Sequence, residues 1–254
     1  MNSFKCHYEL DQRPNRDLVN LNQELYRAIP MVLGTSVNIR LDEDGLPDAV
    51  HYYLLYTSSL VHGAADAALT LVLHNLGRES RLHERSIFEY WVRSKYFCDN
   101  PDEAKLALRA SLFHERRMLE QLEYGRDTDR FREVDRVCNE IVDKYPGAAS
   151  YIEPPIGRIL GAESAFYALH YRIPSQMAHA AFAGSGGVVT EAGIQFDSRE
   201  PDANIALAFV VIYLVAFLDL VQTTIGGPGS RELLAGLKGR WAQIEPTLGL
   251  GKVG

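Results

Sequence analysis

Apolar residues recur along most of the chain at the three- and four-residue spacing of helices, and turn-forming residues separate the runs. One such stripe extends from Leu18 to Ile29, and we expect Asp17 to cap this helix and Pro30 to end it. Further helical runs occupy residues 48–76, 82–100, 101–122, 128–144, 162–183, 205–218 and 230–244. The pattern predicts an all-α protein, a bundle of about eight helices.

The loop between Tyr145 and Pro155 is rich in proline, glycine and serine, and it is the one plausible internal boundary. We nevertheless expect residues 17–254 to form a single domain, because the helices after this loop are too few to bury their own apolar faces. Residues 1–16 are polar and contain a proline, which predicts a loosely ordered lead-in. Two short β-like runs near residues 187–197 predict a small β-hairpin or flap.

The charge of the chain limits its partners. Its 254 residues include 26 basic and 33 acidic side chains, and the net charge is -7. This balance disfavours nonspecific binding to nucleic acid or to an anionic membrane. An RNA partner would therefore have to be held locally, in a basic groove.

The sequence favours a cytoplasmic protein without a membrane span. Ile205 to Leu218 is an unbroken apolar run, but it is shorter than the roughly 20 residues that cross a bilayer, so we expect the core helix of a soluble bundle. The first residues lack the apolar core of a signal peptide and the arginine-rich character of a transit peptide. The 3 cysteines are too scattered for a Cys-x-x-Cys zinc or redox site.

Candidate chemistry begins on the helix expected at residues 82–100. Arg85 and Glu89 are four residues apart, so a helix places the guanidinium and the carboxylate on one face, beside apolar and aromatic residues. A charge in such surroundings is usually either paired or functional. Far downstream, Tyr171, Ser175 and His179 repeat the four-residue spacing. We expect the five polar side chains to converge in one pocket between two helices, although an intrahelical ion pair and hydrogen-bonded packing would explain each set separately.

Together the two sets resemble an uncharacterised bacterial all-helical family of HEPN-like appearance. Its recurring marks are Arg-x3-Glu on one helix and Tyr-x3-Ser-x3-His on a later one, and residues 85–89 and 171–179 match them. The resemblance covers roughly residues 50–225. It implies a metal-independent ribonuclease, acting as a toxin or defence effector, that uses these residues. HEPN-like proteins commonly dimerise, and the apolar helices of this chain would allow a homodimer.

HEPN-like domains that cleave RNA carry Arg-x4-6-His, a spacing that Arg172 and His179 fit. In this chain the spacing alone is uninformative, because about two such pairs are expected by chance and three are present. Arg172 is also followed by the apolar Ile173 and by Pro174, which departs from the polar residue usual in the nucleases. The chemistry is nevertheless suitable, because histidine supplies a base of near-neutral pKa and arginine a cation for the phosphate.

Other functions for these residues were also considered: a metal site, a serine hydrolase and a binding protein. The histidines and acids at His62, Asp66 and His114 lie on helices, yet the Glu-x-x-His repeat of a di-iron bundle is missing, so we expect neither a metal nor another cofactor. Ser175 lacks the Gly-x-Ser-x-Gly turn of a serine hydrolase. The alternative to a ribonuclease is a noncatalytic helical protein that uses the same polar pocket to bind a small-molecule ligand or a partner.

Overall fold

The fold was analysed in a computed structural model of the chain. It describes residues 14–34, 38–74, 76–122, 124–161, 164, 167–168, 171, 189–190, 193–194, 200–227 and 229–248. The lead-in predicted for residues 1–16 therefore lies almost entirely outside the described residues.

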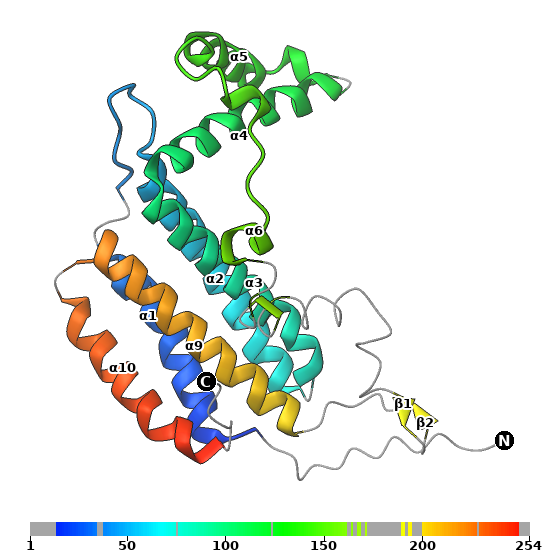
Figure 1. Ribbon diagram of the computed structural model, residues 1–254, viewed down its shortest axis with the longest axis vertical. Helices are drawn as coiled ribbons and strands as arrows, with labels where there is room; N and C mark the ends of the chain where they lie inside the picture. The colour runs from blue at the N-terminus through cyan, green and yellow to red at the C-terminus, as the bar shows by residue number, and fades with distance from the viewer. Residues whose placement is uncertain are drawn as a thin grey trace.

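The described part of the chain is all-α, as the sequence predicted, and contains eight α-helices (Figure 1). The short helix at Ile156–Leu160 was not expected, and the helix predicted at residues 162–183 lies almost entirely outside the described residues. The helices are α1 (Arg16–Leu33), α2 (Ala49–Leu73), α3 (Gly77–Asp99), α4 (Pro101–Gln121), α5 (Asp129–Ile141), α6 (Ile156–Leu160), α9 (Glu200–Thr224) and α10 (Ser230–Ile244). Short 3-10 turns occur at Gly125–Asp127, Ala148–Ser150 and Glu245–Leu248. Within the region where a hairpin was expected, β1 (Val189–Thr190) pairs antiparallel with β2 (Gly193–Ile194).

Both ends of α1 differ from the prediction. The cap is Asn15 rather than Asp17, because the Asn15 side chain accepts hydrogen bonds from the backbone N–H groups of Asp17 and Leu18. Pro30 lies inside the helix instead of ending it, and one more turn follows before Gly34, whose φ of 51° closes the helix. That extra turn buries Val32 completely, which compensates for the hydrogen bond that a proline cannot make.

Helix α9 is the centre of the bundle and packs against α1, α2, α3 and α10 (Figure 1). Its fully buried residues are Ala206, Leu207, Ala208, Val211, Tyr213, Leu214, Phe217 and Leu218. Among the described helices, the segment Ala203–Thr224 alone is long and apolar enough to cross a membrane. Within the protein, 56% of its apolar 18-residue stretch is buried. Its apolar character is therefore matched by the neighbouring helices, which cover most of it.

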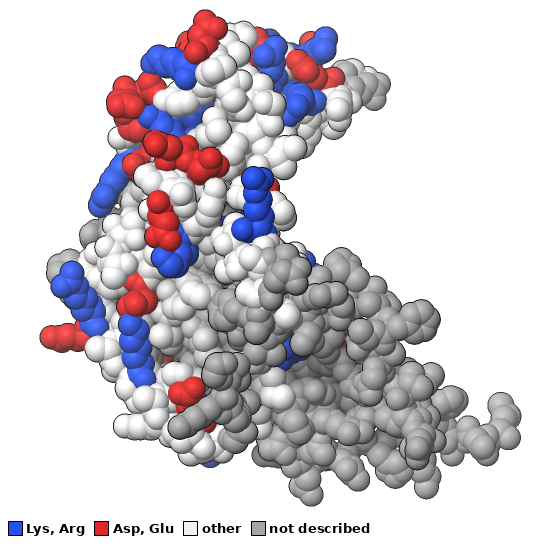
Figure 2. Space-filling view, in the orientation of Figure 1, with Lys and Arg blue, Asp and Glu red and all other residues white. Residues whose placement is uncertain are grey.

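Helices α4 and α5 form an arm that extends beyond the end of the bundle (Figure 1). The arm has a small apolar cluster of its own, centred on Phe113, Val134 and Cys138. Basic and acidic side chains alternate over the visible face of this arm (Figure 2). This arrangement agrees with a solvated surface, the interpretation that the mixed charges of residues 128–144 favour.

An extended segment, residues 151–155, leads from the arm back to the bundle. The Tyr151 hydroxyl donates a hydrogen bond to Glu103 of α4, at 2.9 Å. Arg93 of α3 donates to the Glu153 carboxylate, at 2.8 Å, and to the carbonyl of Pro154, at 3.3 Å. These contacts fix the segment that precedes α6, and α6 itself lies against α3.

Candidate functional site on helix α3

The predicted Arg85/Glu89 pair is present on α3. The Nε–H of Arg85 donates to Oε1 of Glu89 at 2.8 Å, as the four-residue spacing on a helix allows. Ile87 and Phe88 on the same helix are fully buried, whereas the side chains of Arg85 and Glu89 are 18% and 25% exposed. The pair therefore lies at the border of the core, within reach of a ligand.

Tyr171 joins this pair, although 86 residues separate it from Arg85 in the sequence. Nη2 of Arg85 donates a hydrogen bond to the Tyr171 hydroxyl at 3.2 Å, and the guanidinium carbon lies 4.8 Å from the centre of the tyrosine ring. The Tyr171 ring is in turn stacked on Tyr167, with 5.2 Å between ring centres. The structure thus brings together Arg85, Glu89 and Tyr171.

The other predicted site residues, Arg172, Ser175 and His179, lie outside the described residues. Their convergence on Arg85 and their roles therefore stay predictions. Of the five side chains expected to share one pocket, the structure places three, and Arg85 contacts each of the other two.

A second Arg/Glu pair, Arg81 and Glu84, lies one helical turn before the first on α3. Arg81 Nε is 2.8 Å from Glu84 Oε2, but neither atom has a hydrogen bond of good geometry in the described structure. The Glu84 side chain is completely buried, and the Arg81 guanidinium lies over the ring of Phe209 on α9, 5.3 Å from its centre. Sequence reasoning missed this pair, because an Arg-x2-Glu spacing on a polar helix usually marks a solvated ion pair.

Burial gives Glu84 unusual acid–base properties. Removal from water disfavours the charged form and raises the pKa of Glu84 to about 8, and the nearby Arg81 offsets only part of this effect. Burial and the proximity of Glu84 also raise the pKa of Tyr213, on α9. Glu84 is therefore mainly a neutral acid at pH 7, able to donate a proton in a hydrogen bond.

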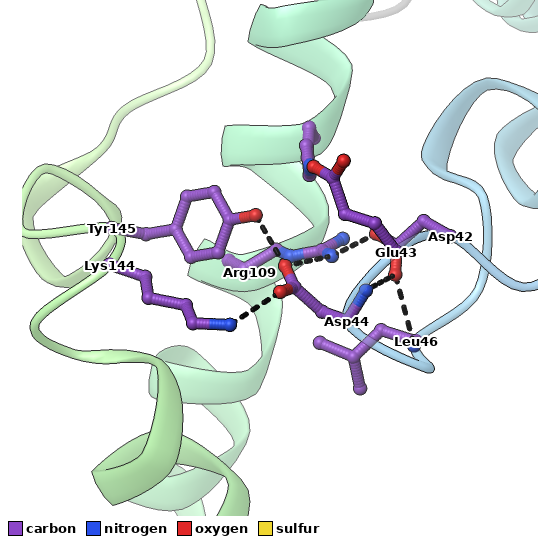
Figure 3. A network of polar contacts seen from close by, with 8 residues as sticks. Asp42, Glu43, Asp44, Leu46, Arg109, Lys144 and Tyr145 are labelled. Carbon is purple, nitrogen blue, oxygen red and sulfur yellow. Dashed lines mark hydrogen bonds and ion pairs between the residues drawn. The ribbon is translucent and has the colours of Figure 1, made fainter.

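Arg109 of α4 is followed by His114 and so also fits the Arg-x4-6-His spacing, but its surroundings indicate a structural role. Figure 3 shows Arg109 of α4 between the carboxylates of Asp42 and Asp44, with Tyr145 approaching from the other side. The fully buried Arg109 pairs directly with Asp42 and lies 3.7 Å from Asp44. Lys144 and Tyr145 donate to Asp44 and lower its pKa to about 2. This network fixes the loop before α2 to the arm.

The metal-site alternative can be compared with the geometry. Within the described part of the chain, no group of three histidine, cysteine, aspartate or glutamate side chains is arranged to hold a metal ion. His62, one of the candidates for a metal ligand, is stacked on Tyr26 with ring centres 4.0 Å apart. His114 is exposed, and its Nδ1 lies 2.9 Å from Nη2 of Arg117.

Replacing Glu89 with alanine tests how strongly the first pair depends on burial. We expect the free energy of unfolding to fall by about 1–2 kcal/mol, between the values typical of exposed and of fully buried ion pairs, because both partners are partly exposed. Urea denaturation followed by circular dichroism would measure this change. Lys95→Ala, which breaks the exposed Lys95/Asp99 pair on the same helix, is the matched control, with an expected loss below about 0.5 kcal/mol. Equal losses in the two variants would contradict the partial burial.

Comparisons of the chain with protein-family models, curated proteins and solved structures gave no match.

Proposed function

We propose that this chain is a metal-independent ribonuclease of the HEPN-like type. In this proposal Arg85 contacts the phosphate, and Tyr171 and Glu89 hold Arg85 in place. His179 acts as the base, with Arg172 and Ser175 beside the scissile group. A role as a toxin or defence effector follows from the resemblance to the HEPN-like proteins.

The position of Arg85 is the observation that supports this proposal best. Its Nε and Nη2 atoms are used by Glu89 and Tyr171, and these two contacts fix the plane of the guanidinium. Nη1 makes no hydrogen bond to any described residue, and the side chain is partly exposed. A guanidinium held at two corners, with no described residue bonded at the third, is suited to contact a phosphate oxygen.

The reaction that these groups would perform is cleavage through the 2′-hydroxyl. His179 would take the proton of that hydroxyl, and the resulting oxygen would attack phosphorus as the bond to the 5′-oxygen breaks. The products would be a 2′,3′-cyclic phosphate and a 5′-hydroxyl, whose proton returns from the protonated histidine or from water. The Arg85 cation would stabilise the extra charge on the pentacoordinate phosphate.

Labelled total RNA, incubated with the purified protein with and without EDTA, tests the proposal. We expect cleavage by the wild type in both conditions and a loss of about 10²–10⁴ in rate for His179→Ala, because a general base contributes that factor. His114→Ala is the control, since His114 is exposed on the arm. Full activity of a folded His179→Ala variant would remove the role assigned to this residue.

A noncatalytic binding protein is the second candidate, and one observation favours it. Glu89 already neutralises much of the Arg85 charge, which weakens attraction to a phosphate and suits a neutral polar ligand. If the protein only binds, the wild type and His179→Ala will both leave RNA intact. The wild type and His179→Ala would then differ only in their affinity for a ligand or partner.

A further inference from the structure

Arg85, Tyr171 and Tyr167 form a column of stacked groups. Arg85 lies over the Tyr171 ring, and the Tyr171 ring is also stacked on Tyr167. The Tyr167 ring lies against the backbone of Gly157, in helix α6. A Cβ atom added to Gly157 would be 3.2 Å from Cζ of Tyr167 and 3.3 Å from one of its ring carbons. The bare backbone of α6 therefore determines how closely Tyr167 can approach.

We propose that Gly157 and Tyr167 are positioning residues of the site: they fix the Tyr171 ring, and through it the Arg85 guanidinium. Neither residue reaches Arg85 directly, so both act through Tyr171. The inference rests on the proposed function only where activity is the readout. The contacts themselves are independent of what the site binds.

The backbone conformation at position 157 does not require a glycine. Its φ is not in the left-handed region, so an alanine could adopt the same conformation. A glycine inside a helix lowers helix stability relative to alanine. A close neighbour is the remaining reason for glycine here, and that neighbour is the Tyr167 ring.

Hydrogen bonds hold the segment before Gly157 and the backbone N–H of Tyr167. The Glu153 carboxylate and the Pro154 carbonyl accept hydrogen bonds from Arg93 of α3, and these contacts hold the residues just before α6. The backbone N–H of Tyr167 donates to the Ser164 hydroxyl at 3.1 Å. An added methyl group at Gly157 must therefore be accommodated by movement of the Tyr167 ring, by a few tenths of an ångström, rather than by movement of α6.

Gly157→Ala tests the proposal against a matched control, Gly236→Ala. Gly236 is in helix α10, and a Cβ added there meets no atom within 4 Å. Both substitutions should leave the Tm unchanged or slightly raised, because alanine favours helices. Only Gly157→Ala should lower kcat for RNA, by about tenfold, because small displacements of an aligned group slow the chemical step. KM should change little.

Tyrosine ring resonances in NMR spectra give a readout that does not depend on activity. With the Tyr171 signals assigned through Tyr171→Phe, they should shift in Gly157→Ala and stay in place in Gly236→Ala. Tyr167→Phe keeps the stacked ring and should retain both the activity and the positions of the Tyr171 signals. Tyr167→Leu removes the ring and should lower the activity and shift the Tyr171 signals.

The outcomes separate this inference from the proposed function. Unchanged Tyr171 signals in Gly157→Ala would overturn the positioning role, whether or not activity falls. If the wild type cleaves no RNA, the ribonuclease proposal fails, and the NMR comparison alone decides whether Gly157 and Tyr167 position the site.

Discussion

Replacing Glu84 with glutamine is expected to stabilise the protein at pH 7 and above and to remove most of the dependence of its stability on pH between 5 and 8. Burial raises the pKa of Glu84 to about 8, whereas in the unfolded chain the ordinary value is 4.5. Between these values the folded state holds a proton that the unfolded state has lost. The free energy of unfolding of the wild type therefore falls as pH rises through this window.

The effect should be large. At pH 7, keeping Glu84 protonated in the folded state lowers the free energy of unfolding by on the order of 3 kcal/mol, because each pH unit above the unfolded pKa contributes about 1.4 kcal/mol. Glutamine needs no proton and avoids this loss. Urea denaturation at pH 5, 6, 7 and 8 would measure the difference. Glu232→Gln is the control, because Glu232 is exposed in the first turn of α10. Parallel stability curves for the wild type and Glu84→Gln would show that Glu84 is ionised and solvated in the folded protein.

Asp42→Asn should destabilise the protein by about 2–4 kcal/mol, because it leaves the buried Arg109 cation without its direct partner. Asparagine keeps an oxygen at the position where Asp42 Oδ1 accepts the backbone N–H groups of Asp44 and Leu46, so the turn itself is preserved. The substitution thus isolates the charge interaction. Chemical denaturation at pH 7 would measure the loss.

Two further variants make the test of this network specific. Glu43→Gln changes a neighbouring carboxylate that is 78% exposed and paired with Lys105, and it should cost less than about 1 kcal/mol. Combining Asp42→Asn with Arg109→Met should restore most of the lost stability, because an apolar side chain needs no counter-charge in a buried position. If the double variant is less stable than Asp42→Asn alone, the stranded charge is not the cause of the loss.

The sequence predicted the long described helices well, because their apolar stripes, caps and breakers are local signals. Pro101 at the start of α4 and the apolar run of α9 are examples. Pro30 shows the limit of this reasoning, since a turn that follows a proline is stable only if tertiary packing buries it, as it does Val32. Local rules contain no information about that packing.

The candidate site was predictable where spacing along one helix determines proximity, as for Arg85 and Glu89. The Tyr171 contact was expected because Tyr171 begins a matching set of four-residue spacings. Glu84 was missed, because nothing in the sequence says which side of α3 faces α9. Gly157 was missed for a similar reason, since its importance depends on a ring that lies ten residues away in the sequence and next to it in space.

The central position of α9 determines when the protein can fold during synthesis. Helix α1 packs on α9 and α10, and the side chain of Asn22 donates to the carbonyl of Leu207, 185 residues later. At about 5–20 residues per second, a ribosome needs roughly 10–40 s to make the chain between these two residues. Throughout that interval α1 can pack against α2, but it lacks the larger apolar contact that α9 provides.

The α2/α3 pair is local and can form early, because the two helices are consecutive and pack on each other. Their faces toward α9, however, stay uncovered until residues 200–224 have left the ribosome. A nascent chain in this state exposes the surfaces that chaperones bind. A message truncated before α9 would therefore yield an aggregation-prone product rather than a smaller folded domain.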